Sequence, residues 1–430
     1  MAMRDRLVLA SVFALVAIAS PASAQDLLIR AGHVLDVEAG RMLADREILV
    51  RDGRIVSIAP PTKAVDPKIP VLDWSALTVV PGLMDMHTHL ADETYGDPAT
   101  PLRSNAARDA FIGAHNARAT LQAGFTTARD VGVYRGFADV QLRDAVNAGL
   151  VPGPRMFVAG AYVTVTGGGG EITGLPAGMQ VPDTFRRGIA DNEAEVRRRV
   201  NEILDAGADF IKLIATGAVL ADGTEPGQSE YTEAEIRAAV EEAERRGSFV
   251  AAHAHGAEGI KRAVRAGVRS IEHGSLMDDE AIALMKRHGT FLVADIYNGD
   301  YIDTVGRRDG WSAEVLRKNL DTTEAQRAGF RKAVAAGVNI AYGTDSGVYP
   351  HGDNARQFVY MVRYGMTPLQ AIRAATLESA RLLRKDKELG SITPGKAADL
   401  VALACDPLTD IACLQQVRGV LKAGVPVARD

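Results

Sequence analysis

The pattern of hydrophobic and polar residues changes twice along the 430-residue chain and divides it into three regions. From Gln25 to about Leu77, short apolar stretches alternate with turns, and the Asp52-Gly53 pair is typical of a tight β-hairpin. From about Val79 onwards, helical segments alternate with apolar strands. After about Leu383 the strand-like pattern returns, as in "GSITPGKAADLVALACDPL". The simplest interpretation is that both chain ends build one small β domain beside a larger α/β domain.

The middle region repeats a simple unit, in which a helical segment is followed by a glycine and then by an apolar strand. The glycine stands where a helix C-terminus favours a positive φ, at Gly124, Gly207, Gly247, Gly267, Gly289 and Gly337. Eight strands are predicted, around 79–83, 126–131, 156–161, 210–215, 249–253, 270–273, 291–295 and 339–344. This count favours a (β/α)8 TIM barrel. A doubly wound open sheet is the alternative, but no glycine-rich dinucleotide motif follows a strand.

We therefore expect an α/β protein with four segments. Residues 1–24 form a signal peptide, residues 25–80 and 386–430 form the two parts of a small β-sandwich domain, and residues 81–385 form the barrel. The first segment carries Arg4 and Arg6, an apolar run over Leu7–Ala19 and an Ala-x-Ala pattern that predicts cleavage after Ala24. The prediction is an exported protein, periplasmic or secreted. A membrane anchor is the alternative, for which the apolar run is short, and no later segment is long enough to cross a membrane.

Composition and charge exclude several other classes of protein. The net charge of −5 gives no electrostatic footprint for nucleic acid. The two cysteines, Cys405 and Cys413, are too few for a disulfide scaffold or a cysteine metal cluster. They could pair in an oxidising compartment, and the sequence leaves this open.

Titratable side chains occur where the predicted barrel strands end, which is the end at which barrel active sites lie. Two residues that are two apart on a strand point to the same side, so His87 and His89 can reach one metal ion. Five of the nine histidines belong to this group. The shared position of His87, His89, Lys212, His253, His255, His273 and Asp345 on this face of the predicted barrel predicts a metal site there.

Lys212 is unusual because it interrupts the apolar stretch "DFIKLIATG", which reads as a strand buried on both faces. A buried ammonium group is costly unless it is paired, neutralised or chemically changed. Either this stretch is not a strand buried on both faces, or Lys212 has a functional role.

Several motifs resemble those of the metal-dependent amidohydrolase superfamily, namely "VVPGLMDMHTHL", "AGFTTARDVG", "AHAHG", "SIEHG" and "GSITPGKAADLV". They are most similar to the branch with imidazolonepropionase-related enzymes, prolidase-type dipeptidases and ochratoxin-hydrolysing amidases. The resemblance implies two divalent metal ions, expected to be Zn2+, bridged by N6-carboxylated Lys212. It implies that His87 and His89 bind one ion together with Asp345, and that His253 and His273 bind the other.

The resemblance also implies the reaction, which is hydrolysis of the amide bond next to a C-terminal amino acid. The substrate would be a dipeptide or an N-acyl amino acid such as ochratoxin A. A metal-bridging hydroxide would attack, and Asp345 would act as general base and then as general acid. His255 would orient the substrate or stabilise the oxyanion, or else support a ligand. Tyr231 is a candidate for the substrate carboxylate, or a hydrophobic staple before the Thr232–Glu235 capping box. Gly169 stands where relatives often have a histidine.

Two alternatives differ in function. The first is a one-metal cyclic-amide (lactam or imidazolone) hydrolase or deacetylase of the same superfamily. The second is a degenerate barrel that binds a ligand without catalysis, against which the complete set of six metal-site residues argues. We expect a small-molecule amide or dipeptide as the partner, no nucleic acid, no membrane after signal removal, and a homo-oligomer. The sequence leaves open the preferred amino acid and the identity of the metal.

Overall fold

The structure is a computed structural model that describes residues 26–62, 66–92 and 97–428. The predicted signal peptide and its cleavage site lie outside the described residues. Among the helices of the described ranges, none is both long and apolar enough to cross a bilayer.

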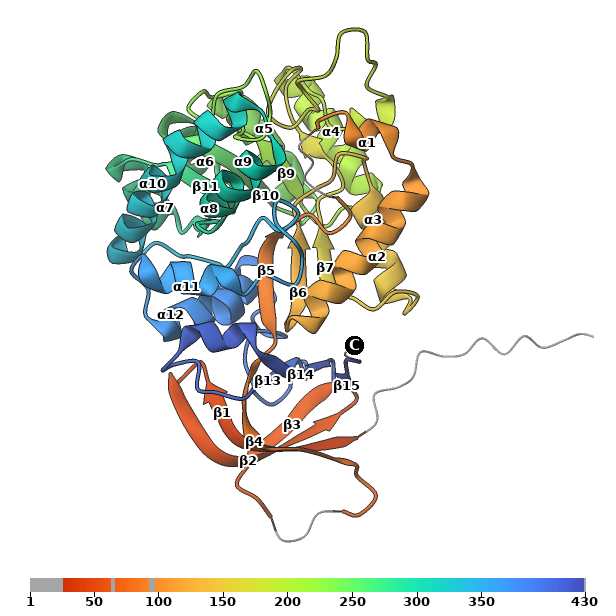
Figure 1. The fold of residues 1–430 in the computed structure, drawn as a ribbon, viewed down its shortest axis with the longest axis vertical. Coiled ribbons are helices and arrows are strands. Elements are labelled where there is room, and N and C mark those ends of the chain that lie inside the picture. Colours follow the sequence, from red (N-terminus) through yellow and green to blue (C-terminus); the bar gives the residue numbers. More distant parts are fainter. Residues whose placement is uncertain (1–25, 63–65, 93–96, 429–430) are drawn as a thin grey trace, which may run out of the picture.

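The two chain ends form one seven-stranded sheet, shown at the bottom of Figure 1. Along the chain, its strands are β1 (Leu27–Asp36), β2 (Arg41–Arg51), β3 (Arg54–Ala59), β4 (Val71–Pro81), β13 (Leu400–Leu403), β14 (Val417–Lys422) and β15 (Val425–Pro426). Their order across the sheet is β15-β14-β13-β4-β1-β2-β3. The sheet closes on its own apolar core because Arg54 of β3 bridges to Ala397, just before β13. The prediction of a β-sandwich built from both ends is confirmed.

The Asp52-Gly53 hairpin is also present, as the turn between β2 and β3. Asp52 and Gly53 have φ values of 46° and 72°, as the mirror-image turn of a tight hairpin requires.

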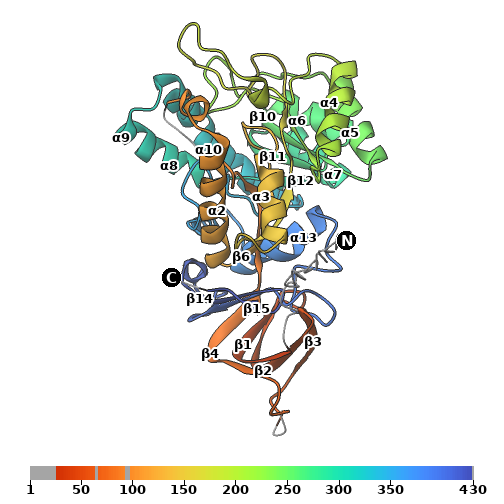
Figure 2. The same ribbon diagram turned by 90° about the vertical axis from the view of Figure 1, so that its right-hand side faces the viewer.

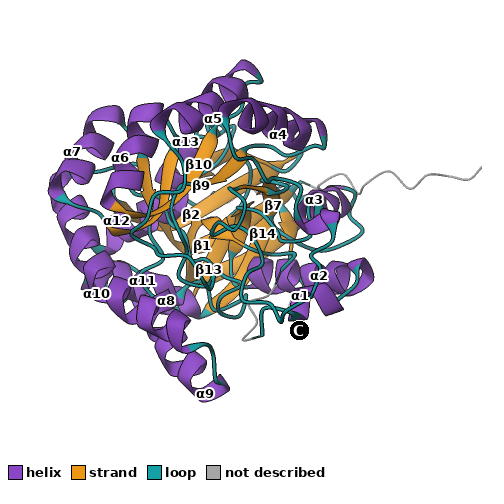
Figure 3. Ribbon diagram, turned by 90° about the horizontal axis from the view of Figure 1, so that it is seen from above, coloured by secondary structure: helices purple, strands orange, loops and turns teal. Residues whose placement is uncertain are grey.

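The second region is a barrel of parallel strands (Figure 3). The strands are β5 (Leu83–Thr88), β6 (Phe125–Asp130), β7 (Arg155–Val158), the short β8 (Tyr162–Val163), β9 (Ile211–Ile214), β10 (Val250–Gly256), β11 (Ser270–Leu276) and β12 (Phe291–Val293). β5, β6 and β7 form one sheet, and β8 to β12 form another. The eighth predicted strand closes the barrel through isolated bridges, from Ile340 to Leu292 and from Ser346 to Thr88. The doubly wound alternative is therefore wrong.

The start of the barrel differs from the prediction of a first strand around 79–83. Val79 to Pro81 complete β4 of the small sheet, and the first barrel strand begins only at Leu83. Gly82 joins the two, and a Cβ atom there would lie 2.2 Å from Thr126 Oγ1. The sequence hides this boundary because the residues on both sides of the glycine are apolar and buried.

Helices cover the outside of the barrel (Figures 1 and 3). The longer helices are α2 (Ala106–Gln122), α3 (Ala138–Asn147), α4 (Glu193–Asp205), α5 (Glu233–Arg245), α6 (Ala257–Ala266), α7 (Asp279–His288), α10 (Ala313–Ala336) and α11 (Arg356–Arg363). The shorter ones are α1 (Thr100–Arg103), α8 (Asn298–Tyr301), α9 (Arg307–Asp309), α12 (Pro368–Arg373) and α13 (Ser379–Leu382). All six glycines of the predicted repeat have positive φ, between 69° and 100°.

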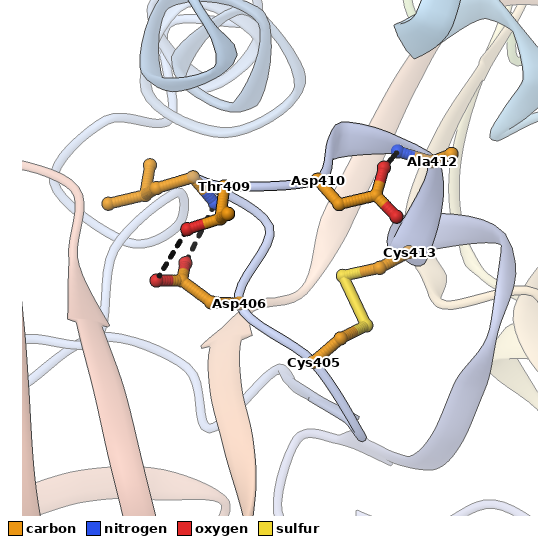
Figure 4. Close-up of a disulfide and its surroundings, with 7 residues drawn as sticks. Cys405, Asp406, Thr409, Asp410, Ala412 and Cys413 are labelled. Atoms are coloured by element: carbon orange, nitrogen blue, oxygen red, sulfur yellow. Dashed lines mark hydrogen bonds between the residues drawn. A yellow bond between two sulfur atoms is a disulfide. The ribbon is translucent and has the colours of Figure 1, made fainter.

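The barrel lies against the small domain, and the C-terminal segment carries a disulfide. Figure 2 shows the barrel standing on the seven-stranded sheet. Cys405 and Cys413 form a disulfide after β13, with their Cα atoms 6.1 Å apart, beside the turns at Asp406 and Asp410 (Figure 4). The structure therefore pairs the two cysteines that the sequence left open.

Candidate metal centre

The carboxyl ends of the barrel strands surround one pocket, and all seven predicted titratable residues line it. β5 and the turn after it supply His87 and His89, β9 supplies Lys212, β10 and β11 supply the other three histidines, and Asp345 follows the eighth strand. The side chains come from opposite sides of the barrel, so only closure of the barrel brings them together.

The first group of possible ligands consists of His87, His89 and Asp345. One ligand atom from each lies within 4.8 Å of the others. Asp345 Oδ1 is 3.3 Å from His87 Nε2 and 3.1 Å from His89 Nε2. Although burial opposes it, the hydrogen bond to Asp345 raises the pKa of His89 to about 9. The Asp345 carboxylate thus favours a positive charge next to it. A divalent cation bound to this group would supply that charge.

The second group consists of His253, His255 and His273, again with ligand atoms within 4.8 Å. A third overlapping group links His273 and Asp345 through Asp295. Burial and the charge of neighbouring His273 lower the pKa values of His253 and His255, so both rings are neutral and can act as ligands. By geometry alone, His255 is as close to this group as the two predicted ligands are.

The histidine rings are oriented by partners on their outer sides. Nδ1 of His87 lies 2.9 Å from Glu272, Nδ1 of His89 lies 2.8 Å from a backbone oxygen, and Nδ1 of His273 lies 3.0 Å from Asp295. Such contacts fix the tautomer, so that each Nε2 is left for the pocket. His253 differs, because its Nε2 lies 3.3 Å from the Gly217 oxygen and Nδ1 is the free nitrogen.

A buried ion pair between Arg129 and Glu272 stabilises the orientation of His87. Arg129 is fully buried and donates from one nitrogen to both oxygens of Glu272, at 2.7 and 2.8 Å. Burial alone would raise the pKa of Glu272, but the Arg129 guanidinium and the contact with His87 hold it well below its usual range. Glu272 therefore stays ionised and can hold His87 in place.

Lys212 is 2% exposed, and its amine lines the same pocket. Burial lowers its pKa to about 8, against the attraction of Glu272 and Asp345. None of the described residues makes a hydrogen bond or ion pair with this amine. Its surroundings therefore make the neutral amine more accessible near neutral pH than it is for a lysine in water.

Two site residues have strained backbones. His273 and Asp345 have φ values of 67° and 56°, a region that residues other than glycine rarely occupy. Such strain persists where the surrounding contacts fix it, and it is common at active sites. Here it aims both side chains into the pocket at the ends of their strands.

The substrate-side predictions have mixed outcomes. Gly169 lines the pocket, and its N–H donates to Glu230 at 2.8 Å. Tyr231 does not line it. Its side chain is 1% exposed within the apolar core, and its hydroxyl donates to the Ala190 oxygen at 2.7 Å. The structure therefore gives Tyr231 a packing role before the capping box of Thr232 and Glu235, and does not support a substrate contact.

Sequence reasoning gave no role to five polar residues that surround the ligands: Arg129, Tyr162, Glu272, Asp295 and Asn298. Glu272 precedes His273 inside the "SIEHG" motif, and Asp295 ends the seventh strand, so both had a signal by position. Tyr162 lies 3.2 Å from His89 Nδ1, and Asn298 lies 3.0 Å from Asp345. Their roles depend on contacts across the barrel.

This fold and this pocket define a class of hydrolase. The chain belongs to the amidohydrolase family, whose model matches residues 78–427, and it is an enzyme that acts on C–N bonds. It is 34% identical to ochratoxinase of Aspergillus niger over 358 residues, which cover 80% of this chain and 73% of that protein.

Solved structures agree with this membership. A Xaa-Pro dipeptidase with methionine bound in its active site is 38% identical, with a TM-score of 0.87 over 94% of this chain and 99% of that one. A prolidase in complex with N-methylphosphonate-L-proline is 32% identical, with a TM-score of 0.87 over 94% and 100% of the two chains. The crystal structure of the A. niger ochratoxinase is 30% identical, with a TM-score of 0.82 over 94% and 96%.

Proposed function

We propose that this protein is a binuclear metal-dependent hydrolase that cleaves the amide bond next to a C-terminal amino acid, in a dipeptide or an N-acyl amino acid. The observation that carries the proposal is the convergence on one pocket of five histidines, Asp345 and a buried lysine that has no hydrogen-bond or ion-pair partner among the described residues. The similarity to ochratoxinase and to prolidases supports this substrate class.

The donor set suits two metal ions. Neutral imidazole nitrogens and carboxylate oxygens are ligands for zinc and other first-row metals. The two ligand groups line one pocket together with Lys212, so one ion would bind to His87, His89 and Asp345 and the other to His253 and His273. We propose zinc for both.

Lys212 is the residue that favours two ions over one. A lysine carbamate offers two anionic oxygens, and a neutral amine is the form that reacts with carbon dioxide to produce it. The low pKa of Lys212 and its lack of a partner in the described part of the chain support this assignment. A carbamate at Lys212 counts against the alternative function, a one-metal cyclic-amide hydrolase or deacetylase.

When bound, the two ions would activate water and polarise the substrate carbonyl. The residues of the chain then handle the proton. Asp345 accepts it from the attacking water and returns it to the leaving nitrogen, so the C–N bond breaks as the C–O bond forms and the amine departs neutral. His255, held by Ser275 at 2.8 Å, faces the same pocket and would orient the substrate carbonyl.

We further propose that the enzyme is exported, periplasmic or secreted, as its first 24 residues suggest, and that it is a homo-oligomer. A disulfide in the small domain is compatible with an oxidising compartment.

The test is a substrate screen with metal-stripped and zinc-reloaded protein. The substrates are ochratoxin A, other N-acyl amino acids, dipeptides with varied C-terminal residues, and lactams. We expect turnover of the first three classes only after reloading, with close to two ions bound per chain. Asp345→Asn is the matched control, since it keeps the shape of the side chain but removes the proton acceptor. Preferential turnover of lactams, or full activity without metal, would contradict the proposal.

A further inference from the structure

Asn298 begins α8, in the segment that follows the seventh barrel strand, and it lines the pocket although it is only 4% exposed. Its carboxamide nitrogen lies between two carboxylates. It donates to Asp345 Oδ2 at 3.0 Å and to Asp295 Oδ2 at 2.8 Å. The Asn298 amide therefore contacts Asp345, which belongs to the first ligand group. It also contacts Asp295, the partner of His273 in the second ligand group.

The orientation of this amide follows from its neighbours. Ionised carboxylates only accept hydrogen bonds, so the nitrogen of Asn298 must face Asp295 and Asp345. The amide oxygen then points away from them, and it is buried without a hydrogen-bond partner among the described residues. A buried acceptor without a hydrogen-bond partner is unfavourable. The two hydrogen bonds from the amide nitrogen to the carboxylates offset this cost.

The two oxygens of Asp345 consequently have different partners. Oδ1 faces His87 and His89, where the first metal ion would lie, whereas Oδ2 receives the N–H of Asn298. A carboxylate oxygen has two lone pairs, so Oδ2 keeps one that is free to accept a proton. Rotation of the carboxylate about its Cβ–Cγ bond would break the contact with Asn298.

Asp295 is itself fixed from the helix behind it. Gln326 of α10 donates to Asp295 Oδ1 at 2.9 Å and to the His273 oxygen at 3.2 Å. A continuous chain of hydrogen bonds thus runs from α10 through Asp295 and Asn298 to Asp345.

We propose that Asn298 is a positioning residue that holds the Asp345 carboxylate in the orientation needed for proton transfer, and that it couples this carboxylate to the Asp295–His273 pair. The inference rests on the proposed role of Asp345. The proton passes from water to Asp345 Oδ2 and then to the leaving nitrogen. Asn298 contributes no proton and keeps its own hydrogens throughout.

The experiment compares Asn298→Leu, which keeps the approximate size of the side chain but has no donors, and Asn298→Ala, which removes the amide; neither variant adds a charge beside Asp295 and Asp345. Each is assayed on an N-acyl amino acid and on the 4-nitrophenyl ester of the same acyl group. Both reactions need Asp345 to accept a proton from the attacking water, but only the amide needs a proton on its leaving group, so this comparison isolates proton donation by Asp345. Asn339→Ala is the control. Its amide donates to the Gly289 oxygen at 3.2 Å, and it does not line the pocket.

We expect kcat for the amide to fall about 10- to 100-fold in both Asn298 variants, because misplacement of a catalytic group by about 1 Å costs up to this amount. KM should change by less than about threefold, the ester rate should fall less than the amide rate because the ester needs Asp345 only as a base, and bound metal and the melting temperature should match those of Asn339→Ala. An unchanged amide kcat would overturn the proposal. So would equal losses on amide and ester accompanied by loss of metal, since these indicate a structural role.

This outcome is separable from the proposed function. If the wild-type protein cleaves another class of C–N bond instead, the substrate class is wrong, and the same comparison on that bond and its ester still tests Asn298. In either case, a loss of rate that is larger for the substrate with the nitrogen leaving group than for its ester supports the positioning role.

Discussion

Replacing Lys212 by methionine should stabilise the metal-free protein while removing its activity. Methionine has nearly the same length as lysine and carries no charge, so it can fill a site that is 2% exposed without introducing a buried cation. In metal-free, carbon-dioxide-depleted protein, the lysine amine has no hydrogen-bond partner among the described residues. The charge is therefore a cost in this state, and the variant removes it.

The size of the effect follows from the pKa. Burial lowers the pKa of Lys212 from 10.5 to about 8. A shift of one unit corresponds to about 1.4 kcal/mol, so the protonated amine destabilises the folded state by about 3 kcal/mol at pH 7. The folded pKa is lower than the unfolded one. The unfolded state therefore binds more protons between pH 8 and 10.5, and the wild-type protein regains stability over that range.

The assay is urea unfolding of chelator-treated wild-type protein and Lys212→Met at pH 7 and pH 9.5. We expect the variant to be more stable by about 3 kcal/mol at pH 7 and by about half of that at pH 9.5. Lys212→Arg is the control, since it keeps a cation and should gain nothing. A variant less stable than the wild-type protein at pH 7 would refute the reasoning, because the amine would then have a favourable partner.

Three other predictions concern groups around the pocket and the effect of metal. Arg129→Met should cost about 3–5 kcal/mol in urea unfolding, because it leaves Glu272 buried without a cation, and adding Glu272→Gln should recover part of this loss. Burial raises the pKa of Glu230 from 4.5 to about 7, so its charged form destabilises the fold above pH 7. Glu230→Gln should therefore be more stable at pH 8, by on the order of 2 kcal/mol, and no more stable at pH 4. Zinc binding should raise the melting temperature of the wild-type protein more than that of Lys212→Met.

Each of these has a result that would contradict it. Equal stability of Arg129→Met and wild-type protein would show that water reaches Glu272. A gain for Glu230→Gln that is the same at pH 4 and pH 8 would not come from ionisation. An equal zinc-induced shift in Lys212→Met and wild-type protein would remove Lys212 from the metal centre.

Local rules predicted the parts of the fold that depend on neighbours in sequence. Gly267 and Gly337 end their helices with positive φ because a Cβ atom would be strained there, whatever the rest of the molecule does. The boundary at Gly82 was misplaced for the opposite reason. Val80 and Leu83 are both buried and apolar, and only their pairing partners, Val401 and Phe125, assign them to different sheets.

Tyr231 is a second case in which the sequence could not predict a contact that depends on tertiary packing. Its position after the fourth strand placed it on the catalytic side of the barrel, but the rotation of its side chain depends on what packs around it. In the structure, the backbone oxygen of Ala190 receives its hydroxyl, and the apolar core covers its ring.

The sequence by itself determined the strand ends, and through them the side of the barrel on which the histidines, Lys212 and Asp345 lie, because a parallel strand presents its C-terminal residues at one edge. Only the tertiary structure decided which groups meet there. Glu272 orients His87 from a strand 185 residues away, and Asn298 reaches Asp345 from 47 residues away. Such contacts arise when the barrel closes, since distances across it depend on the packing of the whole chain.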